Sequence, residues 1–125
     1  MRQSFEKIFD AVDATGAATS GKIDIRQVYS LSLVLTSSNA GNAGAVKFQV
    51  SNDICAFGNI ASAFTPAASS WVDLPSTLVD GSGTVAAGAT VTLAVKQLPY
   101  AWIRAVWTPS AGAGTITGTI NSQGV

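Results

Sequence analysis

The side chains that could carry out bond-making chemistry at neutral pH are few in this sequence. It contains no histidine and one cysteine, Cys55, which excludes a cysteine–histidine nucleophile and a zinc site of clustered Cys and His ligands. The acidic residues are spread along the chain rather than paired for acid–base work: Glu6, Asp10, Asp13, Asp24, Asp53, Asp73 and Asp80. The sequence therefore predicts no enzyme and no catalytic, cofactor-binding or metal site, with a weak calcium site near Asp53 or Asp80 as the alternative.

The aromatic side chains are the one group that could bind a partner, because exposed Trp and Tyr rings stack on sugars and anchor interfaces. In the alternating run 100–108, Trp102 and Arg104 share one face and Trp107 lies on the other, which is expected to face the core. Trp102 could serve a partner surface or a glycan, or it could pack against the N-terminal segment or a neighbouring loop. The candidate interface residues are Phe5, Ile8, Phe9, Tyr100, Trp102 and Arg104.

Short runs of alternating apolar and polar residues, separated by Gly, Ala, Ser and Asn, predict β-strands joined by turns. The runs cover residues 22–26, 29–35, 46–50, 71–74, 78–79, 91–95, 100–108 and 115–120. The alternation changes phase near Gln27 and Val28, which predicts a bulge or a change of sheet there. Residues 46–50 would pair most simply with the strand before them.

This pattern favours an all-β fold, an antiparallel β-sandwich or jelly roll of about eight strands with an N-terminal arm. We expect the arm over residues 1–20 and the jelly-roll domain over residues 21–125. The apolar residues of the arm have helical spacing, but the segment can equally be an arm or an edge strand, so its conformation stays open. The expected core includes Leu33, Phe48, Ile103 and Trp107.

Charge and hydropathy narrow the possible partners. The seven basic and seven acidic residues cancel, so no overall field attracts nucleic acid or an anionic membrane. No apolar run is long enough to span a bilayer, and the N-terminus lacks the apolar core of a secretion signal, which indicates synthesis in a cytoplasm. Low charge also gives little repulsion between copies, so we expect a homo-oligomer, a dimer or trimer.

Taken in order, several segments resemble small virion proteins of tailed bacteriophages: residues 22–25, 46–53, Trp71, 100–108 and 110–116. In such proteins a strand ending in Ser-Asn-Asp, a later Trp, an aromatic strand with Arg and a Gly-rich hairpin form a jelly roll. The resemblance implies a capsid decoration, or cement, protein on the outer capsid surface of the virion, made in the host cytoplasm. Such a protein bridges major capsid protein subunits and stabilises the shell without an active site or cofactor.

A glycan-binding function remains as an alternative to the capsid function. The same pattern fits a β-sandwich module of a phage tail or fibre that binds host-surface glycan. Its contact surface would consist of Tyr100, Trp102 and the loop over residues 57–71.

Overall fold

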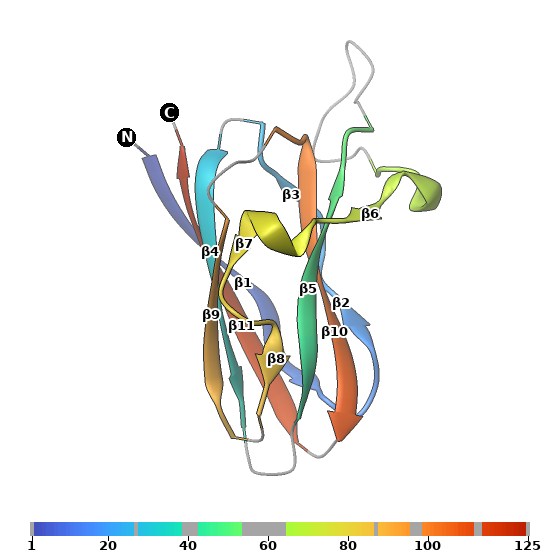
Figure 1. The fold of residues 1–125 in the computed structure, drawn as a ribbon, viewed down its shortest axis with the longest axis vertical. Helices are drawn as coiled ribbons and strands as arrows, with labels where there is room; N and C mark the ends of the chain where they lie inside the picture. The colour runs from blue at the N-terminus through green and yellow to red at the C-terminus, as the bar shows by residue number, and fades with distance from the viewer. Residues whose placement is uncertain are drawn as a thin grey trace.

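Two antiparallel sheets stack face to face in the computed structural model, which describes residues 2–26, 28–38, 43–53, 65–86, 88–95, 99–111 and 114–124 (Figure 1). Sheet A has the strand order β1 (Arg2–Asp13), β11 (Thr115–Gly124), β4 (Val28–Ser37), β9 (Thr90–Val95) and β7 (Val79–Asp80). Sheet B has the order β2 (Ala18–Thr19), β10 (Trp102–Ala111), β5 (Ala43–Ser51) and β6 (Val72–Asp73). Two short strands extend sheet B: β3 (Ile23–Asp24) on β10 and β8 (Thr84–Val85) on β5. Two 3-10 turns, η2 (Ala68–Ser70) and η3 (Ser76–Leu78), flank β6. The predicted β-sandwich is confirmed.

Successive strands cross between the two sheets, which is the jelly-roll arrangement. The chain passes from β1 in sheet A to β2 and β3 in sheet B, returns to sheet A as β4, and crosses again to sheet B as β5. The change of phase near residue 27 is therefore a change of sheet, as predicted. The predicted pairing of residues 46–50 with the preceding strand is wrong, because β5 pairs with β10 instead. Alternation reports which residues a strand buries, and a strand in either sheet can bury the same pattern.

The N-terminal segment differs from the expected arm. Residues 2–13 form β1, which pairs with β11 at the edge of sheet A. Phe9 is 2% exposed and lies opposite Gly118, where an added Cβ would lie 3.2 Å from the phenyl ring. β2 also pairs with β10, so the strands before residue 21 belong to the same sandwich. The edge-strand alternative is the one that the structure adopts.

Irregular pairing explains the helix-like spacing of apolar residues in β1. The register with β11 shifts between Lys7 and Phe9 and again between Phe9 and Val12. Ala11, inside the second irregularity, has a φ of 49°, and its backbone N–H donates to Oγ1 of Thr117 at 3.2 Å. Each bulge resets the period-two alternation, so inward-facing residues no longer fall on every second position.

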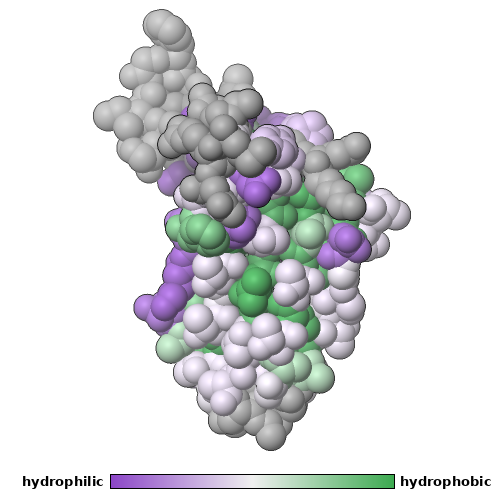
Figure 2. Space-filling model, turned by 90° about the vertical axis from the view of Figure 1, so that its left-hand side faces the viewer, coloured by the Kyte–Doolittle hydropathy of each residue, from purple (hydrophilic) through white to green (hydrophobic). Residues whose placement is uncertain are grey.

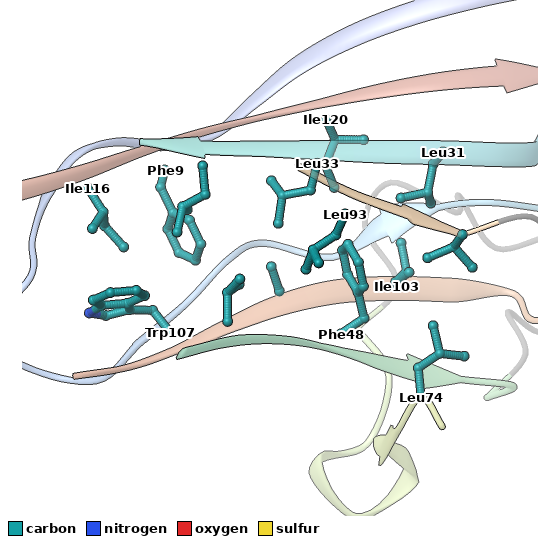
Figure 3. Close-up of a cluster of buried hydrophobic side chains, with 14 of the residues drawn as sticks. Phe9, Leu31, Leu33, Phe48, Leu74, Leu93, Ile103, Trp107, Ile116 and Ile120 are labelled. Atoms are coloured by element: carbon teal, nitrogen blue, oxygen red, sulfur yellow. The ribbon is translucent and has the colours of Figure 1, made fainter. Parts of the chain in front are cut away.

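The core fills the space between the sheets with apolar side chains (Figure 3). Leu33, Phe48, Ile103 and Trp107 are all 2% exposed or less, which confirms the predicted core residues. The indole N–H of Trp107 donates to the backbone carbonyl of Ala14 at 3.3 Å, so this buried polar group is satisfied. In the described part of the chain, no helix is both long and apolar enough to cross a bilayer. With the inner faces occupied by the core, the outer faces of the two sheets remain for contacts.

Candidate interaction surfaces

Two of the sequence-predicted interface residues are buried, which corrects that prediction for them. Phe9 lies in the core, and Trp102 is also only 2% exposed although it lies on the outer side of sheet B. The indole N–H of Trp102 donates to the backbone carbonyl of Asp53 at 2.9 Å. Lys22 Nζ and Arg26 Cζ lie 5.9 and 5.6 Å from the centroid of its ring. The alternative of Trp102 packed against neighbouring chain is confirmed, and this ring offers no open face for a sugar.

The other predicted interface residues do not form one surface. Phe5 is 68% exposed and lies on β1, opposite Asn121 of sheet A. Ile8 and Tyr100 are partly buried against the core. Arg104 is half-buried and belongs to sheet B. Phe5 and Arg104 are therefore on different sheets of the sandwich, and each must be considered with its own neighbours.

The outer face of sheet A carries no charge over its central strands. β11, β4 and β9 contain no Asp, Glu, Lys or Arg. Their registers align the outward side chains in rows across the sheet. We call this surface the threonine face and define it by Thr117, Thr119, Asn121, Ser32, Val34, Thr36, Thr90, Thr92 and Ala94. Figure 2 looks onto this side of the molecule and shows pale and green side chains in its middle, with hydrophilic ones toward the margins.

Charges appear only where the rows of the threonine face reach the edge strands. Lys7 on β1 lies opposite Thr119, and Asp80 on β7 lies opposite Ala94. At the centre, Val34 is 41% exposed, which is large for a valine in the middle of a sheet. The face thus combines an apolar centre with hydroxyl groups around it, and it can be covered by another surface without desolvating a charge.

The outer face of sheet B has the opposite character, because a network of polar and charged side chains crosses it. Arg104 Cζ lies 4.3 Å from the centroid of the Trp71 ring, and its Nε and Nη2 donate to Gln49 Oε1 at 2.9 and 2.7 Å. Gln49 Nε2 in turn donates to Asp73 Oδ1 at 3.0 Å, and Lys47 Nζ donates to Asp73 Oδ2 at 3.0 Å. The Gln49 amide, and then Lys47, hold the pKa of Asp73 below its ordinary value.

A cleft of about 430 Å³ opens beside this network. Its lining comes from the link between β2 and β3, the segment before β6, and strand β10. It consists of Ser20, Lys22, Thr65, Pro66, Ala68, Trp71 and Arg104. The backbone at the cleft is fixed by buried polar contacts, since Ser20 Oγ accepts a hydrogen bond from the Ala105 N–H at 2.8 Å. Sequence reasoning placed Arg104 beside Trp102 and missed its stacking on Trp71, because the two residues come from distant segments.

The potential metal ligands of the described residues do not form a cluster. No group of three or more His, Cys, Asp or Glu residues gathers in the part of the chain that the structure describes. Cys55 and residues 57–64 of the loop named as a glycan contact lie outside the described residues. The side chain of Asp53 accepts a hydrogen bond from the Ala67 N–H at 2.8 Å, which serves the local backbone.

Comparison with known proteins relates the fold to that of a prophage protein. No protein-family model matches the sequence, and no curated protein matches it. The SPBc2 prophage-derived protein YomS is similar in structure, with a TM-score of 0.61 and 8% identity over 97% of this chain and 92% of that chain. PirA aligns over 97% of this chain and 93% of its own with a TM-score of 0.47 and 13% identity. At such low identity the similarity to YomS shows a shared β-sandwich fold, and function must be argued from the surfaces.

Proposed function

We propose that this chain is a structural protein of a tailed-phage particle that decorates the capsid and stabilises it by bridging major capsid protein subunits. In this proposal it acts as a homo-oligomer on the outer capsid surface and performs no catalysis. The threonine face is the observation that carries the proposal. The fold shared with a prophage-derived protein supports a phage setting, and the lack of histidine supports a role without acid–base chemistry.

The threonine face is the centre of a sheet surface whose size approaches that of a protein interface. Its rows span five residues on each of three strands, about 17 Å by 14 Å or roughly 240 Å². The outer surface of the four strands from β1 to β9, about 19 Å wide and at most about 33 Å long, extends this to no more than roughly 600 Å². A standard interface buries about 800 Å² on each partner. The exposed ring of Phe5, which ends one row of the face at β1, would add to this area.

The chemistry of the face suits a neighbour of the same kind. Two copies that meet through uncharged faces bring no like charges together, and threonine and serine hydroxyls can both donate and accept hydrogen bonds. Thr36 and Thr90 already show this capacity, since their Oγ1 atoms lie 3.0 Å apart across two strands. The same property allows the face to cover a capsid subunit without an unpaired buried charge.

Two exposed valines provide a matched test of this interface. Val34 lies at the centre of the threonine face and is 41% exposed, whereas Val72 lies on β6 of sheet B and is 58% exposed. Val34→Lys would place an unpaired charge in the proposed interface, and Val72→Lys would add the same charge elsewhere. We expect Val34→Lys to weaken self-association and binding to phage heads stripped of the protein by at least about 10-fold, which corresponds to about 1.4 kcal/mol.

Sedimentation velocity measures the self-association, and co-sedimentation with stripped heads measures the capsid binding. Val72→Lys should behave as the unsubstituted protein in both assays. A purified chain that is monomeric and does not bind the heads would contradict the proposal. Equal losses in the two variants would contradict the assignment of the interface to sheet A.

A further inference from the structure

The cleft on sheet B is not used by the proposed capsid contact, and its lining has the chemistry of a ligand site. We infer that it binds an acidic saccharide, with the sugar carboxylate on the guanidinium of Arg104 and the sugar ring against Trp71. This inference does not depend on the capsid function, because the threonine face belongs to the other sheet.

Arg104 supplies a cation that no described carboxylate neutralises. The ion pairs among the described residues join Lys7 to Asp10, Arg26 to Asp24 and Lys47 to Asp73. The acceptor that Arg104 contacts is instead the neutral Oε1 of Gln49. A guanidinium has five N–H donors in a planar fork that matches a carboxylate, and its bonds to a single oxygen leave donors for a ligand in the cleft that it lines.

The network behind Arg104 holds this cation in place and leaves its charge uncompensated. The Trp71 ring stacks against the guanidinium at 4.3 Å, and Gln49 fixes it from the side. The carboxylate of Asp73 binds the Gln49 amide with one oxygen and Lys47 with the other. The carboxylate of Asp73 is therefore occupied by other partners, and the Gln49 side chain lies between it and Arg104. Such preorganisation lowers the entropy that a ligand must lose on binding.

The shape and lining of the cleft favour a sugar over a small inorganic anion. Its volume of about 430 Å³ lies within the range of small-molecule sites, about 300–1,000 Å³. Trp71 is half-buried and offers an aromatic ring surface, which complements the C–H face of a sugar. Thr65 is exposed and brings a hydroxyl group to the same lining, and Lys22 brings a second cation. A phosphate ion could use the cations but would leave the ring of Trp71 without a partner.

The test is a titration followed by two-dimensional NMR of the intact protein, with the indole N–H of Trp71 and the Nε–H of Arg104 as reporters. The acidic probes are trigalacturonate, a glucuronate trisaccharide and N-acetylneuraminic acid. Galactotriose and inorganic phosphate are the matched neutral and anionic controls. We expect at least one acidic probe to shift both reporters saturably, with a Kd at least 10-fold lower than that of either control.

Substitutions then assign the binding to the cleft. Arg104→Gln should weaken the binding of that probe at least 10-fold. Arg104→Lys, which keeps the charge and loses the planar fork, should also weaken it. Lys7→Gln makes the same change in net charge on β1 of the other sheet and should leave the affinity unchanged. Thermal unfolding of each variant shows whether it folds. If Arg104→Gln does not fold, the affinity of Arg104→Lys decides the result.

The inference is overturned by any of three results. The first is that no acidic probe shifts the reporters. The second is that galactotriose or phosphate binds as tightly as the acidic probe, which would indicate a neutral-sugar site or an unspecific anion site. The third is that the Arg104 variants bind like the unsubstituted protein.

Discussion

Replacement of Phe9 by alanine tests whether β1 is an integral strand of the sandwich. The side chain is 2% exposed and points into the space between the sheets (Figure 3). Truncation of a buried phenylalanine costs about 3–5 kcal/mol, because apolar contacts are lost and a cavity remains. A domain of this size has a stability of about 5–15 kcal/mol, so the loss is a large fraction of the total. We expect Phe9→Ala to lower the melting temperature by about 10–20 °C.

Urea unfolding followed by tryptophan fluorescence measures this effect, since Trp107 is buried in the same core. Phe5→Ala is the control, because Phe5 lies on the same strand but is 68% exposed. Its change in unfolding free energy should stay within about 0.5 kcal/mol. If Phe9→Ala leaves too little folded protein, Phe9→Leu provides a smaller truncation that should still exceed the control. Equal effects at the two positions would refute the placement of β1 in the sandwich and favour the N-terminal arm expected from the sequence.

Two further predictions concern a close backbone contact and a surface ion pair. A Cβ at Gly44 would overlap the backbone carbonyl oxygen of Thr108 and lie 2.7 Å from two ring atoms of Trp107, so Gly44→Ala should lower the unfolding free energy by about 1–3 kcal/mol. Gly21→Ala, with nothing within 4 Å, is the control and should change the urea midpoint little. Hydrogen bonds from Arg26 lower the pKa of Asp24 in the folded state, so this pair contributes stability above pH ~4 and loses it as the pH falls further. Asp24→Asn should therefore reduce the loss of stability between pH 5 and pH 2 by about 0.2–1 kcal/mol, and an unchanged pH profile would contradict this.

Local alternation was sufficient to predict the strands whose pairing is regular. β4 buries Leu31, Leu33 and Leu35 at every second position, and its predicted bounds lie within the observed strand. β10 follows the same rule, with Trp107 buried in the core and Arg104 on the outer side. These strands are recognisable because one face of each is covered by the other sheet, and burial imposes a period of two on the sequence.

The same signal fails where the pairing is irregular. The bulges of β1 displace Ile8, Phe9 and Val12 from the period of two, so the segment resembles an amphipathic helix as much as a strand. The partner of each strand is also absent from the local pattern. β5 and β10 are separated by some 50 residues of sequence, and their pairing is set by how the whole sandwich closes.

The candidate sites were also predictable only as far as local alternation reaches. Alternation correctly placed Trp102 and Arg104 on one face, but their exposure depends on what covers that face. Lys22 and Arg26 flank β3 and lie over Trp102, so this candidate interface residue is buried, as one of the two sequence alternatives allowed. Trp71 takes its place beside Arg104. The sequence shows that the strands of the threonine face are uncharged. It does not show that they are neighbours, and the observed registers are needed to join their outward side chains into one surface.

The unequal distribution of charge between the two outer faces links the capsid proposal to the cleft. Solvent-exposed surfaces usually mix charges of both signs, and sheet B does so through Lys47, Asp73 and Arg104. The central strands of sheet A carry no charged residue, although the chain contains seven basic and seven acidic residues. An uncharged face is favourable where it becomes covered, and a charged face where it stays in water. Because the faces lie on opposite sides of the sandwich (Figure 1), a copy seated through the threonine face would direct the Trp71–Arg104 cleft away from the surface that it covers, where a saccharide could reach it.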